Sequence, residues 1–197
     1  MMKKQVLAVF DFDGTLIKKD SFIDFTIFSK GLGNFIKGII YNFINLLMYA
    51  LNLKSGDQVK EKLFSYFFAK TSYKKFKDVC TKYSLEKIPK IINPQIFKKF
   101  LEHKKNGDTL ILASASINDW IYPWAKRVGF DKIIATEVAF LGNDLSGRFA
   151  TPNCNNEEKL RRFLEVFPER NQYLLYVYGN LKGDKELLEI ADFKTII

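Results

Sequence analysis

Short apolar runs alternate with amphipathic stretches along most of the chain, with one long interruption. The apolar runs have the length and composition of buried β-strands, and the amphipathic stretches have the period of helices. The predicted strands cover residues 5–10, 109–113, 132–135 and 173–178. The predicted helices cover 94–105, 118–128, 156–167 and 184–191, and a hairpin is predicted over 137–149. Alternating strands and helices predict an α/β fold, a three-layer core in which helices cover both faces of a parallel sheet.

Residues 17–83 are the interruption, because their pattern is helical and contains no convincing strand. They follow the first predicted strand directly. We therefore predict an α/β core domain formed by residues 1–16 and 84–197, with residues 17–83 inserted into it as a helical cap domain.

The segment 35–53 of the predicted cap is largely apolar. A cap helix that is buried on several sides would explain this composition, and so would a helix that contacts a membrane or forms a dimer. A spanning helix needs about 20 apolar residues in a row, and Lys37, Asn42 and Asn45 argue against one. Peripheral membrane contact through the cap therefore stays open as an alternative to burial.

The strongest chemical signal is the sequence DFDGTL at residues 11–16, directly after the first predicted strand. In parallel sheets, ligands bind beyond the carboxyl ends of the strands, and Asp11 and Asp13 fall at such an end. One carboxylate can attack phosphorus while the other transfers the proton of the leaving group. Mg²⁺, which prefers oxygen ligands, would offset the repulsion between carboxylate and phosphate. The structural alternative is a capped turn with solvent-exposed aspartates.

Further polar groups follow the later predicted elements. Ser114 ends the apolar run 110–114, Lys159 ends the sequence NNEEK, and the sequence YGNLKGD covers residues 178–184. With residues 11–16, these segments resemble the motifs of the haloacid dehalogenase superfamily in order and spacing. The helical insertion after the first motif resembles the phosphoserine-phosphatase-like branch, the subfamily IB type. The resemblance covers nearly the whole chain and implies a magnesium-dependent phosphatase.

The resemblance also implies roles for individual residues. Asp11 would attack phosphorus and become an aspartyl-phosphate, and Asp13 would protonate the leaving alcohol and then activate water. The hydroxyl of Ser114 and the N–H of Ala115 would bind phosphoryl oxygens. Lys159 would offset the charge of the nucleophile and of the phosphoryl group.

The implied Mg²⁺ ligands are Asp11, the main-chain carbonyl of Asp13, and the last motif with Asn180 and Asp184. The family most often has Asp where this chain has Asn180, so we predict a weaker metal site than one with Asp. Asp20 stands where phosphoserine phosphatases have a substrate-binding Glu. It is equally suited to cap the first helix of the predicted cap.

Composition narrows the range of partners. The formal net charge is +9, but the lysines are scattered and form no Arg-rich stripe, so we expect no nucleic-acid partner. The two cysteines have no metal-site spacing, and the apolar run before Asp11 is too short for a signal peptide, which favours a cytoplasmic protein with free thiols. His103 is predicted at the surface, and Trp120 with Trp124 in the core.

The expected function is hydrolysis of a small phosphorylated substrate, a phosphate monoester, by a cytoplasmic enzyme. A membrane-associated phosphatase acting on a lipid phosphate, similar to phosphatidylglycerophosphate, is one alternative. The apolar cap predicted for this chain resembles the caps of some lipid phosphatases of the superfamily. A binding protein with little turnover is an alternative of another class, and Asn180 is the residue that favours it. The sequence specifies neither the physiological substrate nor the oligomeric state.

Overall fold

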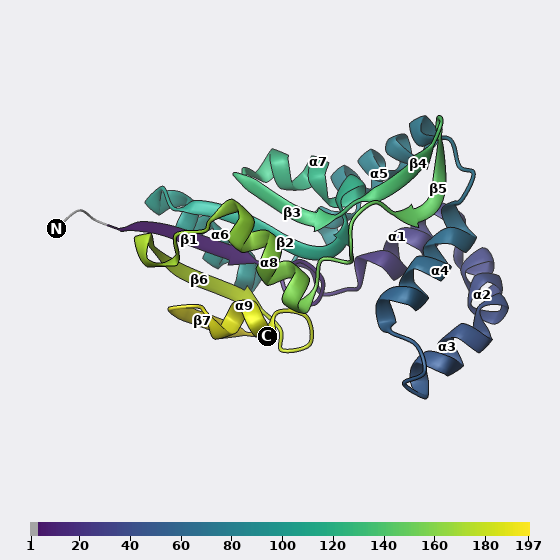
Figure 1. Cartoon of the computed structure of the whole chain (residues 1–197). Helices are drawn as coiled ribbons and strands as arrows, with labels where there is room; N and C mark the ends of the chain where they lie inside the picture. Colours follow the sequence, from purple (N-terminus) through teal and green to yellow (C-terminus); the bar gives the residue numbers. More distant parts are fainter. Residues whose placement is uncertain (1–3) are drawn as a thin grey trace.

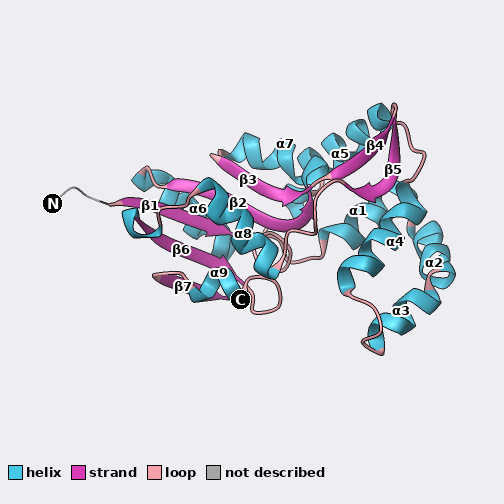
Figure 2. Cartoon of the chain, in the orientation of Figure 1, coloured by secondary structure: helices cyan, strands magenta, loops and turns pink. Residues whose placement is uncertain are grey.

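A five-stranded sheet with strand order β3-β2-β1-β6-β7 forms the centre of the structure, a computed structural model that describes residues 4–197 (Figure 1, Figure 2). Its strands are β1 (Gln5–Phe10), β2 (Thr109–Ile117), β3 (Lys132–Thr136), β6 (Tyr173–Gly179) and β7 (Phe193–Ile196). All neighbouring strands of this sheet pair in parallel. The predicted α/β fold with a parallel sheet is confirmed.

Helices cover both faces of the sheet, because successive side chains of a buried strand point to opposite faces. Phe10 of β1 belongs to a hydrophobic cluster that includes residues of α6 and α7. Val9 belongs to a cluster that includes residues of α8 and α9. These helices are α6 (Pro94–Asn106), α7 (Asn118–Val128), α8 (Asn156–Val166) and α9 (Lys185–Glu189). The three layers of the core follow from this alternation.

The helices between β1 and α6 lie together at the end of the molecule opposite the N-terminus (Figure 1). They are α1 (Ser21–Lys30), α2 (Leu32–Tyr41), α3 (Phe43–Ala50), α4 (Gly56–Phe68) and α5 (Tyr73–Glu86). Aromatic side chains connect them to the core. Phe25 of α1 stacks on the buried Trp120 of α7, with 4.5 Å between ring centroids.

The predicted hairpin is present as β4 (Val138–Leu141) and β5 (Asp144–Phe149), which pair antiparallel. It packs against α4, where the rings of Phe64 and Phe149 lie 5.4 Å apart. The hairpin therefore touches the helical end of the molecule. Among residues 4–197, no helix has the length and apolar character needed to cross a bilayer.

Two predictions need correction. The helix predicted over 184–191 ends at Glu189, and β7 follows it as an exposed edge strand. The four residues of β7, FKTI, form no apolar run, so the pattern of apolar residues does not predict this strand. His103 was predicted at the surface but is only 7% exposed. Its ring nitrogens contact the Asp108 carboxylate (2.7 Å) and the Tyr178 hydroxyl (2.8 Å), and this pairing makes the burial of a polar ring tolerable.

Candidate active site

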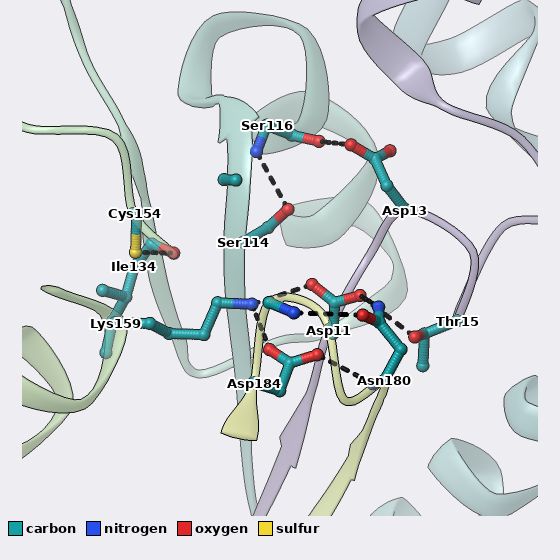
Figure 3. Close-up of polar contacts among 12 residues, drawn as sticks. Asp11, Asp13, Thr15, Ser114, Ser116, Ile134, Cys154, Lys159, Asn180 and Asp184 are labelled. Atoms are coloured by element: carbon teal, nitrogen blue, oxygen red, sulfur yellow. Dashed lines mark hydrogen bonds and ion pairs between the residues drawn. The ribbon is translucent and has the colours of Figure 1, made fainter. Parts of the chain in front are cut away.

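The carboxyl ends of β1, β2 and β6 bring predicted site residues to one edge of the sheet. β1 pairs with both neighbours, so the three ends lie side by side. Asp11 follows β1, Ser114 lies in the last part of β2, and Asn180 follows β6. The Asp11 N–H donates to the carbonyl of Tyr178 (2.9 Å), which fixes the start of the loop after β1. Figure 3 shows Asp11 and Asn180 pointing toward each other, with the Ser114 hydroxyl beside them directed at the Ser116 N–H.

Lys159 is an ammonium group buried between two carboxylates. Its Nζ donates to Asp11 Oδ1 (2.9 Å) and to Asp184 Oδ1, and the residue is 1% exposed (Figure 3). Burial alone would lower the pKa of Lys159, but the charges of the two carboxylates outweigh it and raise the pKa above its usual range. Lys159 lies in the first turn of α8, where the Asn156 N–H donates to the carbonyl of Gly183 (2.9 Å). The loop after β6 and the start of α8 are thus held together.

The second carboxylate oxygen of Asp11 is also held. Asp11 Oδ2 accepts from Thr15 Oγ1 (3.0 Å) and from Asn180 Nδ2 (3.3 Å). Thr15 reaches back to Asp11 because the chain reverses at Gly14, whose φ of +73° is costly for any residue with a side chain. The carboxylate of Asp11 therefore has one orientation at the base of the site.

Asp13 is held by hydroxyl groups on two elements. Asp13 Oδ1 accepts from the N–H of Ser21 at the start of α1 (2.9 Å). Asp13 Oδ2 accepts from Ser116 Oγ of β2 (2.7 Å) and from Ser21 Oγ (3.2 Å). The indole N–H of Trp120 donates to Ser21 Oγ (3.2 Å). Because an indole N–H can only donate, the hydroxyl hydrogen of Ser21 is left to point toward Asp13 or Ser116.

The environment of Asp13 favours its protonated form. Burial raises the pKa of Asp13 to about 7, and the nearby charges of Asp20 and Asp11 act in the same direction. The hydrogen bond from Ser116 opposes them. A carboxyl group with such a pKa can both donate and accept a proton near neutral pH.

The loop after β6 is organised around Asn180. Its Oδ1 accepts from the N–H groups of Lys182 (3.0 Å) and Gly183 (3.1 Å). Its own N–H donates to Asp184 Oδ2 (2.9 Å), and the side chain of Asp184 lies so close to Gly179 that a Cβ there would collide with it. Glycine at position 179 is thus needed for Asp184 to occupy its place beside Lys159.

The oxygen atoms at this site suit a hard cation such as Mg²⁺. Asp11 supplies a carboxylate, and no donor within residues 4–197 forms a hydrogen bond with the main-chain carbonyl of Asp13. Asn180 has an amide oxygen, although its Nδ2 faces Asp11. Among the described residues, no group of three or more His, Cys, Asp or Glu side chains is arranged to hold a metal. Asp11 and the Asp13 carbonyl thus offer oxygen ligands that suit Mg²⁺, whereas Asn180 would have to turn its Oδ1 away from the Lys182 and Gly183 N–H groups to add a neutral third ligand.

A cavity of about 420 Å³ opens above these residues and extends to α3 and α4. Its lining includes Asp11, Asp13, Ser114, Ala115 and Lys159. It also includes apolar side chains of α1, α3 and α4, namely Phe22, Ile23, Leu46, Tyr49, Val59 and Leu63. The cavity therefore combines charged and apolar side chains.

Lys60 of α4 lies in this cavity and was not predicted from the sequence. Its Nζ donates to the carbonyl of Ala115 (2.7 Å) and to Asn153 Oδ1 (2.9 Å). Burial lowers the pKa of Lys60, although the carboxylates around it act in the opposite direction. Lys60 therefore brings a positive charge from the helical end of the molecule to the strand-end loop next to Ser114.

Ser114 and Asp20 occupy different environments. Ser114 is buried, and its Oγ accepts from the Ser116 N–H (3.0 Å), which leaves its own hydroxyl hydrogen for another acceptor. Asp20 is the N-cap of α1 and accepts from the Ile23 N–H (3.0 Å), as one of the two interpretations expected. Asp20 also lines the cavity, so it combines the capping contact with a position open to a ligand.

Ser21 and Ser116 were also absent from the predicted site. Ser116 lies two residues after Ser114 on β2, so its hydroxyl points to the same side of the strand. This spacing could have indicated that Ser116 belongs to the site. Ser21 had no such signal, because it looks like an ordinary first residue of a helix.

Comparison with known proteins gives a consistent result. The family model described as haloacid dehalogenase-like hydrolase matches residues 8–189. Protein CicA of Caulobacter vibrioides is 27% identical over 195 residues, which cover 98% of this chain and 86% of CicA. A crystal structure of a Bordetella pertussis protein of unknown function superimposes with a TM-score of 0.83 at 22% identity, over 98% of this chain and 90% of that one.

A phosphoserine phosphatase solved as a phospho-aspartyl intermediate analogue superimposes with a TM-score of 0.62 at 18% identity, over 98% of this chain and 87% of that chain. At such identities the structural likenesses establish the fold. The family model covers most of the sequence, from within β1 to the end of α9. The chain therefore belongs to the haloacid dehalogenase-like hydrolase family.

Proposed function

We propose that the protein is a magnesium-dependent phosphatase that transfers the phosphoryl group of a phosphate monoester first to Asp11 and then to water. The ammonium group of Lys159, held between the carboxylates of Asp11 and Asp184, is the observation that carries this proposal. A buried cation at this position compensates the charge of a carboxylate that must approach a phosphate anion. Membership of a hydrolase family supports the same reaction class.

In the first step, a carboxylate oxygen of Asp11 attacks phosphorus while the bond from phosphorus to the leaving oxygen breaks. Asp13, whose pKa is raised to about 7, gives its proton to that oxygen, so the leaving group departs as a neutral alcohol. The Ser114 hydroxyl and the Ala115 N–H bind phosphoryl oxygens, and Lys159 balances the charge on the same group.

In the second step, a water molecule attacks phosphorus and Asp13, now a carboxylate, takes one of its protons. The bond between Asp11 and phosphorus breaks, which returns Asp11 as a carboxylate and releases inorganic phosphate. Asp11, the Asp13 carbonyl and Asn180 would hold Mg²⁺, which would neutralise charge between Asp11 and the phosphoryl group. Asp184 would influence this site indirectly, through its contact with Lys159.

Hydrolysis of p-nitrophenyl phosphate with and without Mg²⁺ tests the proposal. We expect turnover that requires Mg²⁺ and is lost when the cation is chelated. A panel of small and lipid phosphate monoesters should follow, because the generic substrate lacks the groups that the cavity recognises. No turnover with any member, together with no binding of a phosphate analogue, would contradict the proposed reaction.

The apolar lining of the cavity favours an amphiphilic substrate as a second candidate. Leu46, Tyr49 and Leu63 line the same cavity as Asp11, so a hydrocarbon attached to a phosphate beside Asp11 could contact apolar side chains of α3 and α4. A lipid phosphate has this chemistry. Higher kcat/KM for a lipid phosphate than for small polar monoesters would support this candidate, and the reverse order would contradict it.

A binding protein with little turnover is the alternative of another class. Asn180 favours it, because an amide ligand adds no negative charge to the metal site. Binding of a phosphate analogue without turnover of any member of the panel would support this alternative.

Replacing Asn180 by Asp should tighten Mg²⁺ binding. The new carboxylate would stand beside Asp11 Oδ2, where Asn180 Nδ2 now lies at 3.3 Å. A second negative charge at that distance lowers the Mg²⁺ concentration for half-maximal activity by about tenfold. In chelator, the repulsion between the two carboxylates should instead lower the thermal midpoint. Mg²⁺ titrations of wild type and variant provide the measurement, and unchanged or weaker apparent affinity would contradict the prediction.

A further inference from the structure

Helix α2 presents a row of apolar side chains to solvent. Leu32, Ile36 and Ile40 are all exposed and are spaced four residues apart, so they share one face of the helix. Gly38 is the only residue of α2 that is buried. A Cβ at Gly38 would overlap the ring of Phe67 in α4, so α2 packs closely on α4 at this glycine, and the Phe35 ring also stacks on Phe67. The exposed apolar row therefore belongs to a helix whose other side packs against α4.

Helix α3 continues this surface. None of its residues is buried, although its sequence is FINLLMYA. Phe43, Ile44 and Leu47 are exposed, with Ile44 at 70%. We call Leu32, Ile36, Ile40, Phe43, Ile44 and Leu47 the α2–α3 face. Figure 1 shows both helices at the end of the molecule, beyond α1 and α4 and away from the parallel sheet. Contiguous exposed apolar surface of this kind is typical of an interaction site.

The charge around the α2–α3 face indicates the kind of partner. Residues 25–56 contain Lys30, Lys37 and Lys54 and no Asp or Glu, within a chain of net charge +9. Lys37 is exposed on α2, whereas Lys30 lies over the Phe68 ring and Lys54 donates to Asn45 Oδ1. An exposed apolar face in a cationic segment without carboxylates suits the interface of a bilayer that contains anionic lipids. A symmetric dimer through the same face would bring these lysines toward their copies, with no acidic residue in this segment to pair with them. The charge therefore favours lipid over a second copy of the chain.

The depth of insertion is limited by the length of the helices. α2 has 10 residues and α3 has 8, which is far below the about 20 that a spanning helix requires. Helices of this length can lie in the plane of the interface with their apolar side chains among the acyl chains. The opposite side of α3 contributes Leu46 and Tyr49 to the cavity that contains Asp11. A protein bound in this way would hold its cavity next to the lipid surface.

We propose that the α2–α3 face binds peripherally to a membrane surface rich in anionic lipids. This binding does not require turnover, so it stands independently of the proposed phosphatase reaction. Its contributions are the burial of the six apolar side chains and the attraction between the lysines of this segment and anionic head groups.

Co-sedimentation of the full chain with vesicles tests the proposal. We would compare vesicles of phosphatidylcholine alone with vesicles that also contain phosphatidylglycerol, at low and at high salt. The wild type should bind the mixed vesicles, with weaker binding at high salt and weaker binding to phosphatidylcholine alone. Ile44→Glu should reduce binding to the mixed vesicles by at least about tenfold, because a carboxylate replaces an inserted apolar side chain.

Leu141→Glu is the matched control. Leu141 is 79% exposed on the β4–β5 hairpin, so this variant adds the same charge at a similarly exposed leucine outside the α2–α3 face. It should bind like the wild type, and both variants should keep the circular dichroism spectrum and the p-nitrophenyl phosphate activity of the wild type.

Three results would overturn the proposal. They are no binding to either vesicle, equal losses of binding in both variants, and a dimer in sedimentation velocity that Ile44→Glu dissociates while no vesicle binding is seen. The last result would assign the face to a second copy of the chain. None of them affects the phosphatase assay, so failure of either proposal can be distinguished from failure of the other.

Discussion

Asp11→Asn should abolish turnover of p-nitrophenyl phosphate, with a loss of at least about 10⁴-fold in kcat, while the protein stays folded. An amide has nearly the size of a carboxylate but lacks a nucleophilic oxygen. Its single oxygen can still accept from Lys159, which now donates to Asp11 Oδ1 at 2.9 Å. Its NH₂ group can donate to Thr15 Oγ1, because that hydroxyl can rotate to accept, and the variant gives up only the long hydrogen bond from Asn180 Nδ2 (3.3 Å). The loss should therefore be chemical and not structural.

Trapping of the phosphorylated enzyme gives a second measurement of the same residue. Borohydride reduces an aspartyl-phosphate to homoserine, so quenched turnover mixtures should show this change at residue 11 in the wild type and not in the variant. Asp20→Asn is the matched control, because asparagine caps a helix as well as aspartate does and Asp20 faces the same cavity. This variant should still turn over the aryl phosphate and form homoserine at residue 11, with a pH optimum moved downward because Asp20 no longer raises the pKa of Asp13. Retained turnover in Asp11→Asn, or homoserine at another aspartate, would assign the nucleophile elsewhere.

The sheet was predictable from the sequence because its inner strands are buried on both faces. The run at 5–10 coincides with β1, and the run at 173–178 ends one residue before β6 does. Such strands are short continuous apolar runs, which the pattern of residues detects well. β7 was missed for the converse reason, since all four of its residues are exposed at the edge of the sheet.

The base of the candidate site was predictable for a related reason. Polar residues directly after buried strands must come together when the strands are parallel neighbours, and this identified Asp11, Ser114 and Asn180. Lys159 required the family resemblance, because a lysine in a helix has no local signal for burial.

Neither the strand-end positions nor the family resemblance predicts that Lys60 belongs to the site. It reaches Ala115 across 55 positions of sequence, from a helix whose place over the sheet depends on the packing of the whole helical end. His103 shows the same limit on a smaller scale. Asp108 was near in sequence, but only the tertiary structure brings the Tyr178 hydroxyl to the other ring nitrogen.

Lys159→Met should cost about 3–5 kcal/mol of unfolding free energy at pH 8 in the presence of chelator. Methionine can fill much of the space of the lysine side chain, but it leaves Asp11 and Asp184 without the ammonium group that both now contact. Both carboxylates are almost fully buried, so water cannot replace the lost cation at low cost. The expected loss is therefore that of a broken buried ion pair, far above the effect of removing a surface lysine.

The pH dependence identifies the cause of this loss. Burial and the charge of Asp11 raise the pKa of Asp184 to about 6 in the wild type, where Lys159 acts in the opposite direction, so the loss of Lys159 should raise the pKa of Asp184 further above its value of about 4 in the unfolded chain. The folded variant therefore binds more protons than the unfolded chain between these values, and its stability rises as the pH falls. The deficit relative to wild type should be largest at pH 8 and clearly smaller at pH 5. Denaturant unfolding at both values provides the measurement.

A second substitution separates charge from packing. Lys159→Met with Asp184→Asn removes one of the two carboxylates and should recover part of the lost stability at pH 8, because the like-charge repulsion with Asp11 disappears. A deficit that is the same at pH 8 and pH 5, and that the double variant does not reduce, would assign the effect to packing. Recovery at low pH and in the double variant would instead establish that Lys159 makes two buried carboxylates tolerable in one site.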